Sequence, residues 1–372
     1  MKIGILTYHF GTNYGGQLQC FALSKTLEAM GHDVEIINYI PQIYKTNLIG
    51  DIRRGLRVLK SNFSLNGIIT AYYTIIKSSS MRKKFKNFQK DYLNIGEPCN
   101  LQNFTERYSH LNLIITGSDQ VWAPSHHSTG AYFFNFNPEF KGKKISYAPC
   151  CAINNIEFEY KELLCTLLSK FDYISVRNKE TQNFVKELID KDVPIVADPT
   201  FLYNFNNFTS PRLPKGEYAV VYILGKEIDG GHKKVIDKIK SEKPLIPIYV
   251  ISLTNDKPHY FYWANKTFWD LNPIDWVAFI KNASFLYTDS FHGVVFALKF
   301  HIPFVAYYKE GLRASRFIEL KKCYSLNNVI CNSDDLNGKT FGDIQPEFTK
   351  TDIISNNLIE ISKNYLNKAI QL

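Results

Sequence analysis

The segment 288–293, which reads TDSFHG, has residue types suited to proton transfer and anion binding. It follows an apolar strand pattern and precedes an apolar helix pattern. Since imidazole exchanges a proton near neutral pH, His292, with Asp289 beside it, is the predicted catalytic group. Ser290 and Gly293 lie where the new helix presents backbone N–H groups, which bind phosphate or carboxylate. The alternative is that Asp289 and Ser290 cap the helix and His292 is structural.

A second strand end, at residues 175–181, reads SVRNKET and contains Arg177. A guanidinium forks two donors onto a carboxylate or phosphate, so Arg177 is predicted to bind an anionic donor. The alternative is a surface arginine paired with Glu180. Asp198, in the later sequence Asp-Pro-Thr, suits a turn cap as well as a ligand contact.

Two loops in the first half of the chain carry side chains suited to a sugar. Residues 8–17 read YHFGTNYGGQ and lack the glycine spacing of a nucleotide loop. Residues 116–122 read TGSDQVW, which combines hydrogen-bonding groups with a tryptophan that could stack on a pyranose. The alternatives are a tight turn at 15–16 and helix capping at 118–119. The predicted acceptor-binding residues are His9, Asn13, Tyr14, Gln17, Ser118, Asp119, Gln120 and Trp122.

The elements that position these loops follow a βαβ pattern. Expected strands are 3–7, 34–39, 113–116, 144–147, 173–175, 195–197, 218–224, 245–251, 285–288 and 304–307. Expected helices are 18–30, 232–241, 273–282, 294–300 and 352–369. The pattern predicts an α/β protein with two doubly wound, Rossmann-like parallel sheets that face a cleft, with ligands at the strand carboxyl ends.

Length and composition agree with two domains. A chain of 372 residues exceeds the usual limit of one core, and a polar stretch at 203–214 reads as a linker. We expect an N-terminal acceptor-side domain at 1–203, with a basic insertion at 42–95. We expect a C-terminal donor-side domain at 204–372, whose last helix, 352–369, packs back on the first domain.

The amino terminus and the cysteines indicate a cytoplasmic protein. Residues 1–6 read as a strand and not as a signal peptide. Seven cysteines without a Cys-x-x-Cys spacing favour reduced thiols and disfavour a structural zinc site. His126 and His127 are adjacent and diverge on a helix or strand, so no metal is expected.

One segment accounts for the whole net positive charge of the chain. Residues 52–90 contain ten Lys or Arg and no Asp or Glu, and since the net charge is +9, the rest of the chain sums to about −1. Apolar residues interleave with these charges, a mixture suited to an anionic bilayer surface. The alternative is a solvated insertion packed by its own apolar residues. No recognised nucleic-acid-binding module accompanies the segment, so no nucleic-acid partner is expected.

With these motifs in view, the chain resembles the polysaccharide pyruvyltransferase family. The matching pieces lie in the family's order between about residue 3 and about residue 307. They read NYGGQLQ at 13–19, GSDQVW at 117–122, SYA at 146–148, SVR at 175–177, DPT at 198–200 and TDSFHG at 288–293.

The resemblance implies a GT-B-like fold and the donor phosphoenolpyruvate, whose three-carbon unit forms a cyclic ketal with two sugar hydroxyls while phosphate leaves. It implies no other cofactor. Arg177 and the helix start at Gly293 would bind the donor, and His292 would be the general acid. One departure is Ser290, where some members place an arginine. Either Arg313, Arg316 or a lysine replaces it, or this branch uses another donor.

The expected acceptor is a polyprenyl-linked saccharide, a precursor of an exopolysaccharide or capsule, at the inner face of the cytoplasmic membrane. An alternative activity is a GT-B glycosyltransferase with a nucleotide-sugar donor, for which Glu227 or Asp229 could bind the ribose. A third hypothesis is a non-catalytic scaffold for glycan assembly. The acceptor sugar, ketal stereochemistry and oligomeric state stay open.

Overall fold

The structure is a computed structural model of the 372-residue chain. It describes residues 1–41, 78–123, 130–151, 158–224, 232–253, 263–308, 314–326 and 340–371, with single positions and pairs between 52 and 76. Several residues named from the sequence therefore lie outside the described part. These are His126, His127, Glu227, Asp229 and Arg313.

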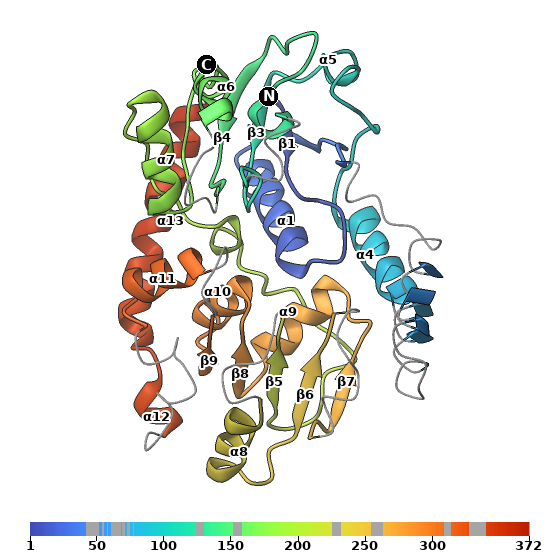
Figure 1. Cartoon of the computed structure of the whole chain (residues 1–372). Helices are drawn as coiled ribbons and strands as arrows, with labels where there is room; N and C mark the ends of the chain where they lie inside the picture. The colour runs from blue at the N-terminus through green and yellow to red at the C-terminus, as the bar shows by residue number, and fades with distance from the viewer. Residues whose placement is uncertain are drawn as a thin grey trace.

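The first half of the chain forms a parallel sheet of four strands in the order β2-β1-β3-β4 (Figure 1). Its strands are β1 (Lys2–Leu6), β2 (Asp33–Ile36), β3 (Leu113–Thr116) and β4 (Lys143–Ser146). Leu6 pairs with Thr116, which pairs with Ser146, so the carboxyl ends of three strands meet at one edge. Its helices are α1 (Tyr14–Ala29), α4 (Ser78–Tyr92), α5 (Phe104–Arg107), α6 (Phe158–Leu168) and α7 (Lys179–Ile189), with short helices η4 (Ala131–Phe133) and η5 (Pro199–Phe201).

The second half forms a parallel sheet of five strands in the order β7-β6-β5-β8-β9. Its strands are β5 (Ala219–Tyr222), β6 (Ile248–Ile251), β7 (Lys266–Phe268), β8 (Phe285–Thr288) and β9 (Phe304–Ala306). Its helices are α8 (His232–Glu242), α9 (Pro273–Lys281) and α10 (Phe291–Lys299), followed by α11 (Ala314–Cys323), α12 (Phe341–Ile344) and α13 (Phe348–Ile370). The predicted pair of parallel-sheet α/β domains is confirmed.

Several details differ from the sequence-based expectation, among them the following. Residues 173–175 and 195–197 form single bridges, Ile145 to Tyr173 and Val176 to Ile195, and no strand. The strand β7 was not predicted. Helix α1 begins at Tyr14 and not at Leu18, because the Asn13 side chain accepts a hydrogen bond from Gly16 N and caps the helix earlier.

The two domains share a continuous apolar core. Tyr14 of α1 stacks on Trp276 of α9 with 5.4 Å between ring centroids, and its hydroxyl donates to Leu271 O at 2.9 Å. The long helix α13 lies along both domains (Figure 1). Its Tyr365 hydroxyl donates to Ser146 O of the first sheet, at 2.7 Å, and its Asp352 pairs with His301 of the second domain, at 2.9 Å.

Within the described part of the chain, no helix combines the length and apolar character needed to traverse a bilayer.

Candidate active site

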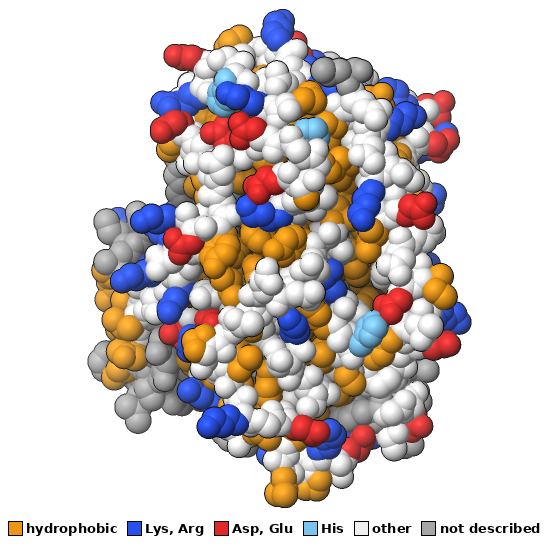
Figure 2. Space-filling model, turned by 180° about the vertical axis from the view of Figure 1, so that it is seen from behind, with side chains coloured by type: hydrophobic (Ala, Val, Ile, Leu, Met, Phe, Trp, Pro, Cys, Tyr) orange, Lys and Arg blue, Asp and Glu red, His pale blue; other side chains and the backbone are white. Residues whose placement is uncertain are grey.

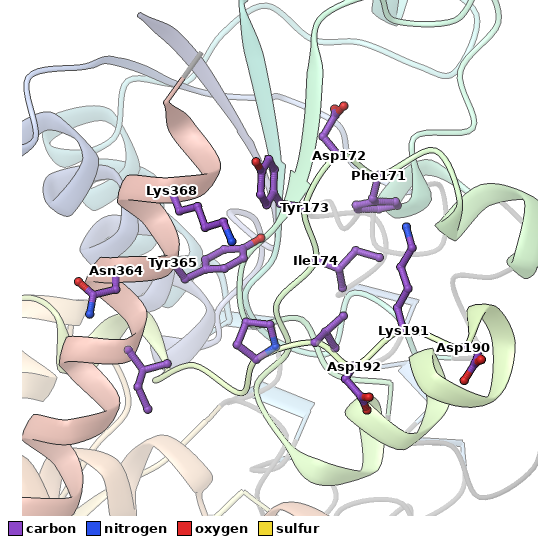
Figure 3. Close-up of a pocket in the computed structure, with 13 residues that line it drawn as sticks. Phe171, Asp172, Tyr173, Ile174, Asp190, Lys191, Asp192, Asn364, Tyr365 and Lys368 are labelled. Carbon is purple, nitrogen blue, oxygen red and sulfur yellow. The ribbon is translucent and has the colours of Figure 1, made fainter.

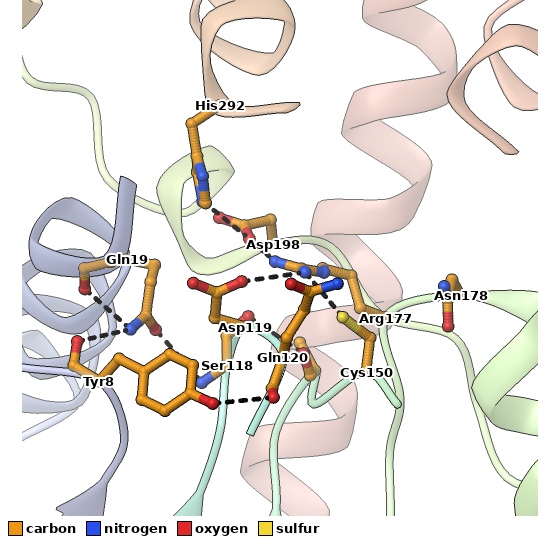
Figure 4. Close-up of polar contacts among 12 residues, drawn as sticks. Tyr8, Gln19, Ser118, Asp119, Gln120, Cys150, Arg177, Asn178, Asp198 and His292 are labelled. Carbon is orange, nitrogen blue, oxygen red and sulfur yellow. Dashed lines mark hydrogen bonds and ion pairs between the residues drawn. The ribbon is translucent and has the colours of Figure 1, made fainter. Parts of the chain in front are cut away.

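The centre of the site is the buried guanidinium of Arg177 (Figure 4). Its Nη1 donates to Asp198 Oδ2 at 2.8 Å. Its Nη2 donates to Asp119 Oδ1 at 3.3 Å and to Cys150 Sγ at 2.8 Å. Charge-assisted hydrogen bonds of this kind fix both position and orientation, so Arg177 is a rigid cation clamped between two carboxylates. We call these four residues the Arg177 cluster.

Electrostatics keep both carboxylates ionised. Burial would raise the pKa of Asp119, but Arg177, with His292 and Arg316, holds it below its ordinary value. Burial would likewise raise the pKa of Asp198, yet His292 and Arg177 lower it strongly. Burial alone would depress the pKa of Arg177, but its acidic neighbours raise it. One cation therefore faces two anions, and the cluster carries a net negative charge.

His292 reaches this cluster from the second domain (Figure 4). It lies in the first turn of α10, whose amino end is capped because Ser290 Oγ accepts from Gly293 N at 3.2 Å. Its Nε2 lies 3.5 Å from Asp198 Oδ2. No other polar atom of the described residues hydrogen-bonds this buried nitrogen, so the Asp198 carboxylate is the group that orients the imidazole.

Gly15 allows the two domains to meet at the imidazole. A Cβ atom at Gly15 would lie 2.0 Å from His292 Nδ1, which no side chain could occupy. At Gly16 the nearest atom would be Tyr8 O, at 3.6 Å, an ordinary contact. Gly15 therefore lies within helix α1 and not in a tight turn, and its lack of a side chain lets His292 pack against the helix.

The loop after β3 delivers Asp119 to Arg177. Asp119 has a φ of 73°, and Gly117 has a φ of 112°, both in the left-handed region. The intervening Ser118 is buried, and its Oγ donates to Ala148 O at 3.0 Å. Its backbone N donates to Gln19 Oε1 at 3.2 Å. Ser118 thus holds the loop, while Asp119 completes the cluster.

Trp122 contradicts the expectation of an exposed stacking platform. Its side chain is fully buried, stacks on Phe133 with 5.1 Å between centroids, and donates its indole N–H to Tyr132 O at 3.1 Å. No face of the indole is left for a sugar. Trp122 belongs to a hydrophobic cluster that includes Leu6, Ile114 and Phe133.

Three residues of the loop at 8–17 also have structural partners. Tyr14 is buried between the domains, as described above. Gln17 is buried, and its Nε2 donates to His9 O at 2.7 Å. His9 is buried as well, which lowers its pKa. The structure therefore removes these side chains from the accessible acceptor surface, whereas Asn13 is exposed and Gln120 is half-buried.

The side chain of Asp289 contacts the loop after strand β5 and not the Arg177 cluster, where a catalytic partner of His292 was expected. Its Oδ1 accepts a hydrogen bond from Leu224 N at 2.5 Å. It therefore ties the loop after β8 to the end of β5. The two carboxylates that pair with Arg177 are those of Asp119 and Asp198. The carboxylate beside His292 is that of Asp198 and not that of Asp289.

Asp198 and Cys150 are the residues that sequence reasoning underrated. Asp198 caps η5, because its Oδ1 accepts from Thr200 N at 3.1 Å, and its Oδ2 binds Arg177. The Asp-Pro-Thr sequence after a strand pattern was the available signal. For Cys150 no signal pointed to the site, since only the fold brings its thiol to Arg177.

A cavity of about 430 Å³ opens beside the cluster. Phe291 separates two arginines at its wall: the Arg177 guanidinium carbon lies 4.6 Å from the ring centroid and that of Arg316 lies 5.8 Å from it. Glu319 also borders the cavity; it accepts from Lys179 N at 2.8 Å, and burial raises its pKa to about 7. The remaining wall is mostly apolar and includes residues of α11 and α13.

A second cavity, of about 640 Å³, lies between α13 and the segments 171–174 and 190–194. In Figure 3 the side chains of Tyr365 and Lys368 point from α13 toward Tyr173. No residue of the Arg177 cluster lines it. Among the residues described, no group of three or more His, Cys, Asp or Glu side chains has the arrangement of a metal site.

Comparisons with known proteins agree with this architecture. A family model described as polysaccharide pyruvyl transferase matches residues 13–308. A search of curated proteins finds no match. Among solved structures, Arabidopsis thaliana UGT89C1 complexed with UDP-L-rhamnose is 11% identical with a TM-score of 0.52, over 99% of this chain and 97% of that one. S. aureus MnaA with UDP is 13% identical with a TM-score of 0.51, over 98% and 97%. These likenesses show a GT-B fold.

Proposed function

Because the chain belongs to the polysaccharide pyruvyl transferase family, we propose that it transfers the pyruvyl group of phosphoenolpyruvate to a sugar of a cell-surface polysaccharide precursor. The product is a cyclic ketal on two hydroxyls of the sugar. The observation that carries this proposal is the buried pair of His292 Nε2 and Asp198 Oδ2, which face each other across the domain junction at 3.5 Å.

The reaction requires ordered proton movement. Two sugar hydroxyls form bonds to C2 of the donor, the C2–O bond to phosphate breaks, and the methylene C3 gains one proton to become a methyl group. Of the two hydroxyl protons, one balances C3 and the other leaves with phosphate. His292 exchanges these protons as general acid and base, and the Asp198 carboxylate orients its ring and stabilises the imidazolium.

The donor is a small dianionic or trianionic molecule and needs cations at fixed places. Arg177 borders the cavity at a position that Asp119 and Asp198 determine; because these carboxylates already offset its charge, its role is to orient the donor by hydrogen bonds. Arg316 borders the same cavity across Phe291 and stands in for the arginine that the family motif would place at Ser290. The amino end of α10 adds its helix dipole. The proposed reaction uses no further cofactor, because the phosphate of the donor is already a leaving group.

The acceptor side lies on the loops of the first domain. Asn13 and Gln120 remain accessible there and would hydrogen-bond sugar hydroxyls. We propose a polyprenyl-linked saccharide as the acceptor, which places the reaction at the inner face of the cytoplasmic membrane, in exopolysaccharide or capsule assembly.

The competing activity is a glycosyltransferase with a nucleotide-sugar donor; of the two structures named above, one holds UDP-L-rhamnose and the other UDP. The purified protein is incubated with polyprenyl-linked saccharides and either phosphoenolpyruvate or a set of nucleotide sugars, and release of phosphate or nucleotide is followed. We expect acceptor-dependent phosphate release from phosphoenolpyruvate. Acceptor-dependent release of nucleotide alone would overturn the proposal and establish its rival.

A matched pair of histidine variants tests the catalytic role. His292→Gln should lower the rate by about 10² to 10⁴-fold, the usual contribution of general acid–base catalysis. His301→Gln, at a histidine whose side chain is 50% exposed, should leave it unchanged. Full activity of His292→Gln in vitro would remove His292 from the mechanism. Unchanged polysaccharide assembly in cells, without turnover by the unchanged protein in vitro, would favour the scaffold.

A further inference from the structure

An exposed face of the first domain combines large apolar side chains with lysines and arginines. Five large apolar residues between 52 and 76 are 40–55% exposed: Ile52, Leu56, Ile68, Tyr72 and Ile76. Exposed large apolar side chains that recur within one short segment indicate an interaction surface. We call these five residues, together with the exposed lysines of α4, the basic apolar face.

Helix α4 supplies the lysines and fixes the face to the domain. Met81, Phe85 and Phe88 are buried on its inner side. Lys83, Lys86 and Lys90 are exposed on its outer side, at the spacing of one helix face. At the left edge of Figure 2, orange hydrophobic side chains lie on the surface with blue basic side chains close by.

The charge of this region indicates which class of partner it binds. Residues 52–90 contain no acidic residue, while the rest of the chain is almost neutral. An anionic bilayer accepts both components at once, because lysines and arginines reach lipid phosphates while aliphatic side chains enter the acyl boundary. A nucleic acid would use the charges but would leave Ile52, Leu56 and Ile68 in water. We propose that the basic apolar face docks the protein on an anionic phospholipid membrane.

The face is joined directly to the acceptor loop of the site. Phe85 of α4 contacts Tyr14 with 4.9 Å between ring centroids, and Gln89 Nε2 donates to His9 O at 2.9 Å. Docking through α4 therefore holds the loop at 8–17 at a fixed offset from the bilayer. That geometry suits a lipid-linked acceptor, although docking itself does not depend on the proposed reaction.

The test uses the full chain and vesicles of phosphatidylcholine with or without phosphatidylglycerol, recovered by sedimentation. We expect recovery with the anionic vesicles that falls as salt rises, and little with the neutral ones. Equal recovery with both, or recovery insensitive to salt, would overturn the proposal. So would a DNA or RNA oligonucleotide that binds the protein more tightly than the anionic vesicles do.

Two matched triple variants test whether the basic apolar face or the total charge of the protein drives membrane binding. Lys83, Lys86 and Lys90 are changed together to Glu, and as a control Lys350, Lys363 and Lys368 of α13 are changed likewise. Each triple lowers the net charge from +9 to +3. Since one lysine near an anionic surface strengthens partitioning about fivefold, the α4 triple should lose on the order of a hundredfold and the α13 triple much less. Equal losses would show that total charge alone acts.

A second pair tests the apolar component. Leu56→Ser with Tyr72→Ser should weaken recovery about tenfold or more, because each removes an exposed side chain able to insert. Leu245→Ser with Ile353→Ser changes residues that are 96% and 67% exposed on other elements. Recovery with these controls should match that of the unchanged protein. An unchanged Leu56, Tyr72 variant would contradict insertion.

Discussion

The Arg177 cluster and the basic apolar face use the same cationic residue types under opposite conditions. Arg177 is buried and held by Asp119 and Asp198, whereas Lys83 and Lys86 are exposed in a segment without acidic residues. A buried cation must have anionic partners, since the free-energy cost of removing its charge from water would otherwise not be offset. An exposed one remains solvated, and its attraction to a partner is screened by salt. Position in the fold, not residue type, therefore separates a fixed electrostatic centre from a docking surface.

The largest expected effect is the loss of the buried cation. Arg177→Met leaves two carboxylates buried without their counter-charge and should lower the free energy of unfolding by about 3 to 5 kcal/mol. Arg107→Met, at an arginine 41% exposed beside Glu97, should cost about 1 kcal/mol or less. Denaturant titration of both variants measures the difference. Equal costs would mean that the cluster is not held as described.

The next effect concerns the contact between the domains. Gly15→Ala places a Cβ 2.0 Å from His292 Nδ1, so the imidazole must move or α10 must shift. We expect a cost of about 1 to 3 kcal/mol in unfolding free energy and a fall in turnover. Gly16→Ala is the matched control, with no atom nearer than 3.6 Å. If Gly15→Ala folded and turned over like Gly16→Ala, the close approach of α1 to His292 would be refuted.

Sequence reasoning singled out the segments of Arg177 and His292, because a short apolar run followed by polar residues and a helix is a local pattern; the run before His292 is the strand β8, whereas the run before Arg177 forms only a single bridge. It could not supply the partners of Arg177. Asp119 lies 58 residues away and Asp198 lies 21 residues away. Their meeting depends on strand order, which the sequence pattern leaves open.

Two further errors have the same physical origin. Trp122 in a polar loop looked accessible, but the chain turns its ring onto Phe133. Gly15 looked like a turn residue, yet its role depends on a histidine 277 positions later. Burial and domain contact are set by the tertiary packing of distant segments, so a window of ten residues does not contain them.

A smaller effect is expected from Glu319, at the border of the cavity. Burial raises its pKa from 4.5 to about 7, so the folded state binds a proton that the unfolded state releases. The contribution of this carboxyl group to the free energy of unfolding is fully present below about pH 4.5 and is lost as the pH rises through about 7. Glu319→Gln should reduce the fall in the free energy of unfolding between pH 5 and pH 8 by on the order of 1 kcal/mol. Thermal or denaturant unfolding across this pH range measures the difference. The exposed Glu360→Gln should keep the original slope, and an unaltered slope in Glu319→Gln would contradict the assignment.

The smallest expected effect completes the comparison with Arg177. Changing Lys83, Lys86 and Lys90 together to Ala should alter the free energy of unfolding by no more than about 0.5 kcal/mol, because these side chains are exposed and alanine favours the helix. The same variant should lose most of its salt-sensitive recovery with anionic vesicles. Urea titration and sedimentation on one preparation measure both quantities. A large loss of stability would mean that the lysines of α4 support the fold, and the contrast between a structural cation and a docking cation would fail at this face.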